Sequence, residues 1–489
     1  MLMSMSHKWR QFPGRVLLLQ GPVGPFFLRF ARALRAAGAE EVHKVNFNGG
    51  DRLFYPRHAV NFSGRPEQWP AFLEQLLKRH KIDAVLLFGD CRPIHRAAIE
   101  VAQHCGVYVG VFEEGYVRPN FVTYERYGAN GHSNIPRSAE FYRGLPETPS
   151  FAEPQVGNAF WITALWAMLY FTAATLLRPL YRHYRHHRRL SMLEGLPWIR
   201  SAWRKLYYAF AERGIQARLT GALSGRYFLL PLQVSTDSQV HVHSRYESVP
   251  KFIEDVVASF AAHAPGDSVL VVKHHPLDRG YHDYSALIRE LAARFGLRDR
   301  ILYVHDLHLP RLLDHAAGVV LINSTVGMSA LFHRAAVKVC GTALYDFAGL
   351  TYQGALDDFW HAAAGFRPDA RLFGKFRNYL IRHTQLCGSF YRRFDFTQSL
   401  GGDSLDRQAS SPPAPETGAG VQVLVPAERR AASRVDGAAP LAHRPELVMI
   451  SSHAPRDRAE RRRDPTAADL ERRRRARESP IRQQRPLHD

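Results

Sequence analysis

The chain has 489 residues, enough for two or three compact domains, so a small disulfide-stapled fold is excluded. Hydrophobic residues make up 46% and charged residues 22%, which is ordinary globular usage, so most of the chain is expected to fold unaided. The net charge of +20 favours anionic partners such as phosphates or lipid headgroups, although a solvated basic surface would give the same number.

The first part of the chain repeats a unit of strand, loop and helix. A short apolar run at 15–20 is followed, after a glycine-rich loop, by helical periodicity at 26–37, and the same order recurs from 84 to 112. No long apolar run precedes residue 16, so we expect a cytoplasmic protein without a signal peptide. Continuous apolar strands alternating with helices predict a Rossmann-like domain over residues 13–150.

A helical segment rich in aromatic residues and arginine is predicted next, at residues 151–225. Residues 159–177 contain no charged residue and meet an arginine cluster at 178–189. At 19 residues the stretch is barely long enough to span a bilayer, and a span would separate the two halves of the protein. We expect a helix on the membrane surface, with its arginines on anionic lipid; a helix buried between domains is the alternative.

Strands and helices alternate again after residue 226, which predicts a second Rossmann-like domain over 226–398. Two such domains facing one cleft describe the GT-B architecture, a pattern that other doubly wound proteins share. Residues 399–489 are dominated by Pro, Ala and Arg with little apolar periodicity, so a disordered tail is predicted. The tail lacks aromatic residues between its arginines, so we expect solvated charge there and no nucleic-acid binding.

An acidic pair, Glu113 and Glu114, directly follows a predicted strand and precedes Gly115. Ligands of open parallel sheets bind just outside such strand ends. Two neighbouring carboxylates repel, which raises the pKa of one and suits an acid/base pair or a carboxylate nucleophile, whereas a solvated turn is the plain alternative. Asp90 and Arg92 follow the preceding strand and are candidates to line the same cleft.

A second candidate site, Lys273 with His275 and Pro276, follows the predicted strand 269–272. Cationic and imidazole donors at a strand end suit a phosphate. His274 and His275 do not suggest a metal, because adjacent residues of an extended chain point in opposite directions and no Cys or carboxylate follows at zinc spacing. We therefore expect no metal.

Two loops complete the candidates. Asn323, Ser324 and Thr325 lead from a buried strand into a helix, where a capping hydroxyl and exposed amides can hold an anion. The loop from Gln20 through Gly21 to Gly24 fits neither nucleotide-binding glycine motif, so an ATPase or nicotinamide enzyme is disfavoured and a substrate-facing loop remains.

Six motifs in order resemble the KpsS/LipB family of capsule polysaccharide proteins over residues 13–395. They are Gln-Gly-Pro-x-Gly-Pro-Phe-Phe at 20–27, Gly-Asp-Cys-Arg-Pro at 89–93, Glu-Glu-Gly-Tyr-x-Arg-Pro at 113–119, Lys-His-His-Pro-Leu-Asp at 273–278, Asn-Ser-Thr-Val-Gly at 323–327, and a run from Tyr-Asp at 345–346 to Phe-Trp at 359–360. Together these motifs are far more specific than any one of them.

The resemblance implies a retaining β-Kdo transferase that uses CMP-Kdo and places the first Kdo on a phosphatidylglycerol-type lipid at the inner leaflet of a Gram-negative cell. Such a protein is expected to be peripheral on the inner membrane, with other capsule assembly proteins as further partners and no tightly bound cofactor. The alternative is a non-enzymatic capsule export or scaffold component, but a scaffold does not need acid, imidazole and hydroxyl groups gathered at strand ends.

The resemblance also assigns roles to residues. By similarity to β-Kdo transferases and to bacterial sialyltransferases, Glu114 is expected at the reacting carbon and His275 at the leaving group. Related β-Kdo transferases carry Asp where this chain has Glu114, so its role as nucleophile or base stays open, with Glu113 as electrostatic partner. Nucleotide and phosphate binding is assigned to Lys273, His275, Pro276, Asn323, Ser324 and Thr325. The sugar or acceptor cleft is assigned to Gln20, Gly21, Gly24, Asp90, Arg92 and Arg118.

Overall fold

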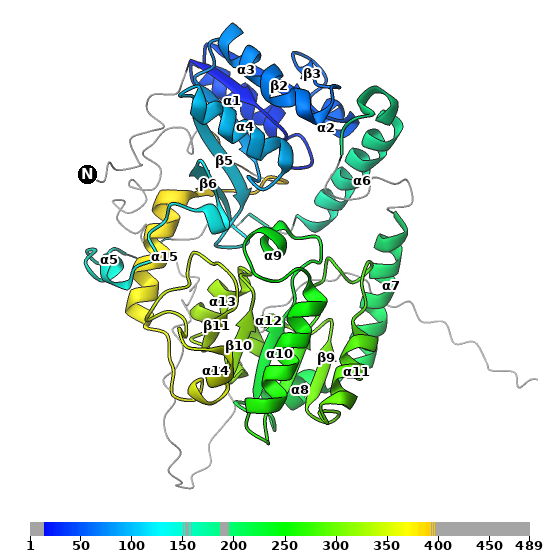
Figure 1. The fold of residues 1–489 in the computed structure, drawn as a ribbon, viewed down its shortest axis with the longest axis vertical. Helices are drawn as coiled ribbons and strands as arrows, with labels where there is room; N and C mark the ends of the chain where they lie inside the picture. The colour runs from blue at the N-terminus through cyan, green and yellow to red at the C-terminus, as the bar shows by residue number, and fades with distance from the viewer. Residues whose placement is uncertain are drawn as a thin grey trace, which may run out of the picture. The chain divides into compact units, whose positions relative to one another are not determined.

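The computed structural model describes residues 14–149, 151, 156–157, 159–185, 195–392, 394 and 396, all of which belong to one compact unit that ends at Ala414. The predicted tail at 399–489 lies outside the described residues. Within them the chain forms two separate β-sheets with helices around each (Figure 1).

The N-terminal half is built on a seven-stranded sheet with the order β12-β6-β5-β4-β1-β2-β3. Strands β1 to β5 are parallel, and the last two strands pair antiparallel at one edge. The strands are β1 (Arg15–Leu18), β2 (Glu41–Asn46), β3 (Val60–Asn61), β4 (Ala84–Phe88), β5 (Tyr108–Glu114), β6 (Phe121–Arg126) and β12 (Gln385–Cys387). The helices are α1 (Phe26–Ala36), α2 (Gly49–Phe54), α3 (Trp69–Arg79), α4 (Pro93–His104) and α5 (Ala139–Arg143).

The parallel strands read as continuous apolar runs because both faces of the sheet are covered. Side chains alternate between the faces: Leu17 and Val85 lie in one hydrophobic cluster, and Leu18 and Leu86 lie in another. The first cluster is closed by α3 and α4, and the second by α1. This is why period-two alternation is missing from the sequence there.

The C-terminal half is a five-stranded, wholly parallel sheet with the order β11-β10-β7-β8-β9. Its strands are β7 (Tyr227–Pro231), β8 (Val269–Lys273), β9 (Ile301–Val304), β10 (Gly318–Leu321) and β11 (Val337–Val339). Its helices are α9 (Ser238–Val242), α10 (Val249–His263), α11 (Ser285–Arg294), α12 (Leu309–His315), α13 (Val326–Phe332), α14 (Leu356–Ala362) and α15 (Ala370–Thr384).

The first strand of each half, β1 or β7, lies between the second and the fourth, so both halves share the doubly wound order 3-2-1-4-5. Such sheets bind ligands beyond the carboxyl ends of the strands at the point where the order reverses. The predicted GT-B-like fold, with two Rossmann-like halves, is confirmed.

Two details differ from the sequence prediction. Strand β5 continues through Glu114, where the sequence analysis ends it at 112, because β6 returns antiparallel and pairs with Glu113 and Glu114. Strand β12, predicted with the C-terminal domain, pairs with β6 of the N-terminal sheet, and Phe390 beyond it packs edge-on against Phe26. Local periodicity does not reveal a strand partner more than 250 residues away.

The segment between the halves contains α6 (Phe160–Leu176), α7 (Gly195–Ala211) and α8 (Ile215–Thr220), and short 3-10 turns lie at Pro66–Gln68, Asn130–His132 and Arg178–Tyr181. Helix α6 packs closely on α2, since a Cβ added to Gly49 would lie 2.2 Å from the Ala173 carbonyl oxygen. One face of α6 is thus buried, while Trp161 on another face is 82% exposed. Among the described residues, no helix has the length and apolar character needed to cross a membrane.

Candidate active site

The acidic pair lies at the carboxyl end of β5, where Glu113 pairs with Thr123 and Glu114 with Val122 of β6. Successive side chains of a strand point to opposite faces of the sheet, so the two carboxylates have different surroundings. An oxygen of Glu113 lies 3.6 Å from the position that a Cβ on Gly89 would occupy, at the end of β4. Glu114 instead accepts a hydrogen bond of 3.0 Å from the Tyr391 hydroxyl.

Burial raises the pKa of Glu113 to about 7. The negative charges of Glu114 and Asp90 raise it further, while the backbone N–H of Glu114, 3.0 Å from Glu113 Oε1, and the Arg92 guanidinium lower it. Repulsion within the pair is the cause expected from the sequence, but desolvation raises the Glu113 pKa more. A carboxyl group with a pKa near 7 can take up and release a proton at neutral pH.

Arg118 connects the acidic pair to the other half. Its Nε donates to the Gly115 carbonyl oxygen at 3.1 Å, directly after the pair. The same guanidinium lies close enough to lower the pKa of His275, which follows β8 of the C-terminal half. Burial is the first cause of that shift and takes the His275 pKa to about 4. Arg118 therefore lies beside the acidic pair and within electrostatic range of His275.

The His275 ring is neutral, and its hydrogen bond shows which ring nitrogen carries the proton. The backbone N–H of Leu277 donates to His275 Nδ1 at 3.2 Å, so the ring proton is assigned to Nε2. With a pKa near 4 this ring carries no charge at neutral pH, which makes it a hydrogen-bond donor and not a general acid in the free protein. The adjoining Pro276 is exposed.

Two other predicted phosphate ligands, Lys273 and Asn323, already donate hydrogen bonds to backbone carbonyl oxygens of the protein. The buried Lys273 ammonium donates to the His305 carbonyl oxygen at 3.3 Å, and burial lowers its pKa to about 8. Asn323 Nδ2 donates to the carbonyl oxygens of Gln239 and His243, at 2.9 and 3.1 Å. These contacts fix the ends of β8 and β10 and leave less of either side chain for a ligand.

Ser324 and Thr325 stand at the start of α13, as predicted, but neither makes the expected cap. Thr325 occupies the N-cap position without a side-chain hydrogen bond to the helix. Ser324 Oγ accepts from the Val326 N–H at 3.2 Å in a local turn. The Thr325 hydroxyl is instead part of a pocket wall.

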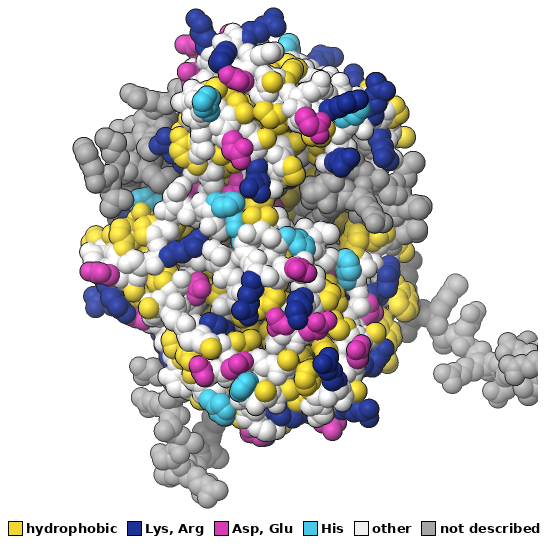
Figure 2. Space-filling model, in the orientation of Figure 1, with side chains coloured by type: hydrophobic (Ala, Val, Ile, Leu, Met, Phe, Trp, Pro, Cys, Tyr) yellow, Lys and Arg dark blue, Asp and Glu magenta, His cyan; other side chains and the backbone are white. Residues whose placement is uncertain are grey.

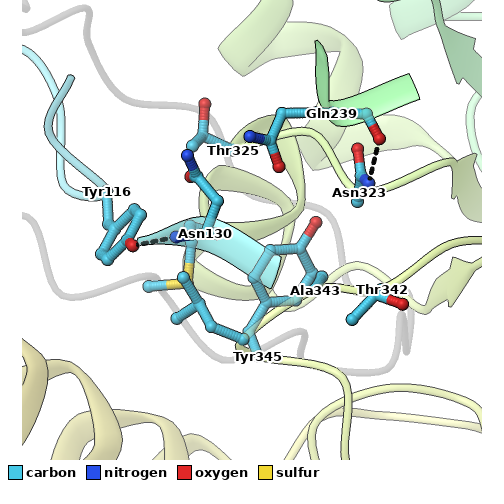
Figure 3. A pocket seen from close by; sticks show the side chains of 10 residues that line it. Tyr116, Asn130, Gln239, Asn323, Thr325, Thr342, Ala343 and Tyr345 are labelled. Carbon is cyan, nitrogen blue, oxygen red and sulfur yellow. Dashed lines mark hydrogen bonds between the residues drawn. The ribbon is translucent and has the colours of Figure 1, made fainter. Parts of the chain in front are cut away.

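This pocket joins the two halves, with Tyr116 and Asn130 on one side and Asn323, Thr325 and Tyr345 on the other (Figure 3). Aromatic rings, amides and hydroxyls line it together. These groups can both donate and accept hydrogen bonds, but the cavity volume is about 10 Å³, which is room for about one water molecule.

The first loop faces α6 more than it faces the cleft. Gln20 is buried, and its Nε2 donates to the Tyr170 hydroxyl at 3.1 Å and to Asp51 Oδ2 at 3.1 Å. Gly24 has φ of +107°, and a Cβ there would lie 2.5 Å from the Trp166 ring, so glycine is required by both backbone and space. A Cβ on Gly21 would meet the Phe27 ring at 2.8 Å.

Asp90 and Arg92 form hydrogen bonds with residues of neighbouring loops. Asp90 is buried, and its Oδ2 accepts from the Ala129 N–H at 3.0 Å and from His132 Nδ1 at 2.9 Å. Arg92 Nη1 donates to Gln20 Oε1 at 2.7 Å and so links the ends of β4 and β1. The two arginines assigned to the sugar or acceptor cleft differ in exposure: Arg92 is half-buried and within electrostatic range of Glu113, and Arg118 is exposed and within range of His275.

A family model described as "Capsule polysaccharide biosynthesis protein" matches residues 83–391. The chain belongs to this family. It is 46% identical over 388 residues to the capsule polysaccharide export protein KpsS of Escherichia coli, covering 77% of this chain and 97% of that protein. It is 40% identical over 400 residues to the capsule polysaccharide modification protein LipB of Neisseria meningitidis serogroup A, covering 80% of this chain and 94% of that one.

Among solved structures, the β-Kdo 2,7 transferase of Thermosulfurimonas dismutans KpsC matches with 16% identity and a TM-score of 0.36, over 74% of this chain and 89% of that chain. HepE of Anabaena, in complex with UDP-glucose, matches with 12% identity and a TM-score of 0.32, over 81% and 100%.

Sequence reasoning missed several residues of this capsule protein's candidate site. Tyr391 contacts Glu114 from a segment that follows β12, and Tyr116 and Asn130 line the pocket from loops of the N-terminal half. His132 and His243 approach Cys91 from opposite halves. The polar, glycine-rich stretch 128–133 does indicate a functional loop around Asn130 and His132, although it assigns them no role, whereas nothing local marks Tyr391 or His243.

Proposed function

We propose that this capsule protein is a retaining β-Kdo glycosyltransferase that transfers Kdo from CMP-Kdo to a phosphatidylglycerol-type lipid, starting the β-Kdo linker of the capsule glycolipid. The observation that carries the proposal is that the acidic pair and His275 lie at strand ends of the two halves, with Arg118 hydrogen-bonded beside the pair and within electrostatic range of His275. Family membership supports the biological setting.

In this proposal Glu114 is the nucleophile. Its carboxylate attacks the anomeric carbon of Kdo, the bond from that carbon to the phosphate oxygen breaks, and CMP leaves with the electron pair. The Tyr391 hydroxyl, 3.0 Å from Glu114 Oε1, orients the carboxylate. Burial and the Glu114 charge raise the pKa of Tyr391 well above its ordinary value, so the phenol stays protonated and donates.

Glu113 is assigned to the second displacement. An acceptor hydroxyl attacks the same carbon, the bond to Glu114 breaks, and Glu113 takes the hydroxyl proton. Because the two side chains leave β5 toward opposite faces, this step requires the acceptor hydroxyl to lie just beyond the end of the strand, within reach of both. Its place beside Gly89 and Arg92 supports this role, because the loop after β4 is the predicted acceptor side. Two inversions at one carbon give overall retention.

The departing phosphate is assigned to Arg118 and to the Nε2–H of His275, since a guanidinium and a neutral imidazole both donate to phosphate oxygens. The cytosine ring is assigned to the pocket of Figure 3, which must widen from its cavity volume of about 10 Å³ to admit it. Once open, the amides of Asn130 and Gln239 and the Thr325 hydroxyl can match the donor and acceptor edge of the ring. No metal is required for either assignment.

The lipid acceptor is assigned to the side of the protein that carries α6 and α7. Helix α7 exposes an apolar stripe at helical spacing, with Ile199 68%, Trp203 64%, Leu206 74% and Phe210 66% exposed. Exposed cations accompany the two helices at Arg178, Arg182, Arg185, Arg200, Lys205 and Arg213. Figure 2 shows Lys and Arg side chains gathered over the region of α2 and α6. Apolar stripes flanked by cations suit an anionic membrane surface.

Membrane contact can be tested apart from catalysis. Flotation with vesicles of phosphatidylglycerol and phosphatidylcholine should recover the protein with the vesicles, and replacing Trp203 and Leu206 by Ala together should reduce recovery about tenfold or more, given about 1.5–3 kcal/mol per large apolar side chain. Phe332→Ala is the matched control, since Phe332 is 59% exposed on α13. Equal losses for both variants, or none for the double variant, would contradict the assignment of α7.

The transferase activity is tested with purified protein, CMP-Kdo and a lysophosphatidylglycerol analogue, with mass spectrometry of the lipid. A Kdo-lipid product is expected, and it should be absent with Glu114→Gln while CMP still binds. A folded protein that forms no product would favour the export or scaffold alternative.

A further inference from the structure

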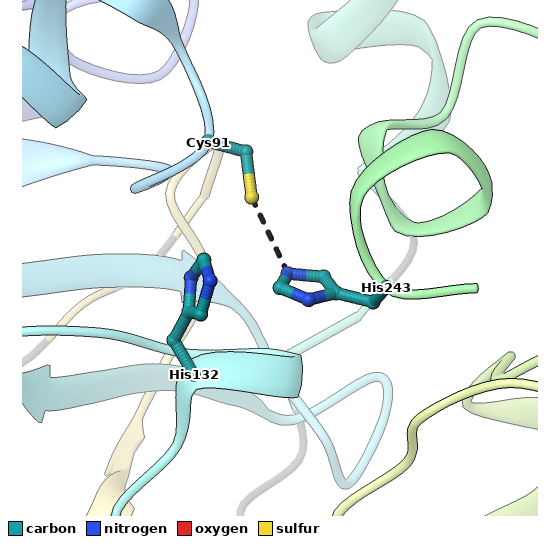
Figure 4. Close-up of side chains that lie close together, drawn as sticks. All are labelled: Cys91, His132 and His243. Atoms are coloured by element: carbon teal, nitrogen blue, oxygen red, sulfur yellow. Dashed lines mark hydrogen bonds between the residues drawn. The ribbon is translucent and has the colours of Figure 1, made fainter. Parts of the chain in front are cut away.

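Three side chains that are distant in sequence meet where the two halves approach each other (Figure 4). Cys91 lies in the turn between β4 and α4, His132 ends the 3-10 turn after β6, and His243 is the C-cap residue of α9. One ligand atom from each lies within 4.8 Å of the other two. Cys91 Sγ is 3.4 Å from His243 Nε2, and the two imidazole rings are 4.4 Å apart at 80°.

His132 is held as metal-ligating histidines are held. Its Nδ1 donates to Asp90 Oδ2 at 2.9 Å, and Asp90 is buried, with the Ala129 N–H as a second donor at 3.0 Å. A carboxylate that accepts from one ring nitrogen fixes the tautomer and leaves the lone pair of the other nitrogen free for a metal. A merely solvated histidine needs no such support from a buried Asp.

His243 is also fixed in position. A Cβ on Gly131 would lie 2.2 Å from His243 Nδ1, so the ring is packed against that backbone with Nε2 toward Cys91. An imidazole binds a metal through the lone pair of such a ring nitrogen.

We propose that Cys91, His132 and His243 bind one Zn²⁺ ion through three protein ligands, with the fourth tetrahedral position open. Thiolate and imidazole are the ligands that Zn²⁺ prefers, at about 2.3 and 2.0–2.1 Å. Ligand atoms of such a site are about 3.5 Å apart, so a small inward rotation of the side chains is sufficient. Binding releases the Cys91 thiol proton to solvent and forms the sulfur–zinc bond.

Without the ion, the same residues would form a hydrogen-bonded cluster. Cys91 Sγ lies 3.2 Å from Asp90 Oδ1 as well as 3.4 Å from His243, so the thiol has partners of its own. Burial and the Asp90 charge raise the pKa of this thiol well above its ordinary value. The two states differ in one observable: only the metal-bound state contains a thiolate.

The ion would join the two halves, because Cys91 and His132 belong to the N-terminal half and His243 to the other. Asn323 Nδ2 donates to the His243 carbonyl oxygen at 3.1 Å, so the site is continuous with the end of β10. This inference goes beyond the proposed transferase reaction and does not depend on it. It also departs from the expectation of no metal, which examined only ligands close together in sequence.

The test uses full-length protein without a histidine tag, from which a chelator has removed any metal. The protein is titrated with Co²⁺ as a spectroscopic probe, and Zn²⁺ is then added to compete with Co²⁺. The background carries His80→Ala, because Glu41, His43 and His80 form a second group of potential ligands. We expect one equivalent of Co²⁺ with a thiolate-to-cobalt charge-transfer band, displaced by Zn²⁺.

Cys91→Ser should abolish that band, and His243→Ala should weaken Zn²⁺ binding at least tenfold. Cys105→Ser, at a free cysteine at the other end of α4, should leave both unchanged. Circular dichroism of each variant shows whether it remains folded. The proposal fails if no charge-transfer band forms in folded protein, or if the band survives Cys91→Ser.

Discussion

Glu113→Gln should make the protein more stable at alkaline pH while impairing its activity. The folded state raises the Glu113 pKa from 4.5 to about 7, so it retains a proton that the unfolded chain releases. The contribution of Glu113 to the free energy of unfolding is therefore fully present below pH 4.5 and is lost as the pH rises toward 7. Glutamine never ionises, and its Oε1 can still accept the Glu114 N–H.

The size of the effect follows from the shift. At about 1.4 kcal/mol per tenfold change in proton affinity, a change from 4.5 to about 7 corresponds to at most about 3 kcal/mol. Because the side chain is half-buried and water reaches it, we expect about 1–2 kcal/mol. For a protein of this size, that corresponds to a melting temperature higher by about 1–2.5 °C.

The assay is thermal unfolding of wild type and Glu113→Gln at pH 4.5 and pH 8. The variant should melt higher at pH 8 and within about 1 °C of wild type at pH 4.5. Glu74→Gln is the control, because Glu74 is paired with Lys78 at 2.6 Å on the surface, so its loss should lower stability slightly or not at all. A Glu113→Gln variant that melts at or below wild type at pH 8 would refute a desolvated Glu113.

Three further predictions concern the same site and its supports. As a base, Glu113 must be ionised, so kcat for transfer should rise with pH through about 7. This rise of kcat with pH should be absent in Glu113→Gln. Tyr391→Phe removes the donor to Glu114 and should lower kcat about tenfold to a hundredfold with little change in the KM for CMP-Kdo, whereas a matching rise in KM would contradict an orienting role. Gly24→Ala should lower the melting temperature by several degrees, because φ is +107° and Trp166 occupies the space, while Gly266→Ala, with open space around it, should be neutral.

The sequence predicts much of the fold because the strands of both halves are buried on two faces and so read as unbroken apolar runs. The runs at 84–88 and 269–272 became β4 and β8, and their ends carry Asp90 and Lys273 as expected. Local sequence patterns do not predict which strands pair when the two strands are far apart in the sequence. Strand β12 joins the N-terminal sheet because Gln385–Cys387 meets an unpaired edge of β6, which periodicity cannot show.

Part of the candidate site lies where the sequence predicts it. Glu113 and Glu114 end strand β5, and His275 follows strand β8. Gln20 was predicted to face substrate, yet it is buried and bonded to Tyr170, because α6 covers its loop. The sequence does not distinguish a buried polar residue from one that binds substrate. At Gln20 the packing of α6 makes that distinction.

The most direct test of the central claim is the covalent intermediate on Glu114. Brief incubation of the protein with CMP-Kdo in the absence of lipid, followed by denaturation and peptide mass spectrometry, should find one Kdo on the peptide that carries Glu114, and addition of lysophosphatidylglycerol before denaturation should remove it. Glu114→Gln should show no adduct, whereas Glu113→Gln should accumulate it, because the second displacement lacks its base. Rapid formation of Kdo-lipid by Glu114→Gln, or an adduct on another residue, would contradict Glu114 as the nucleophile.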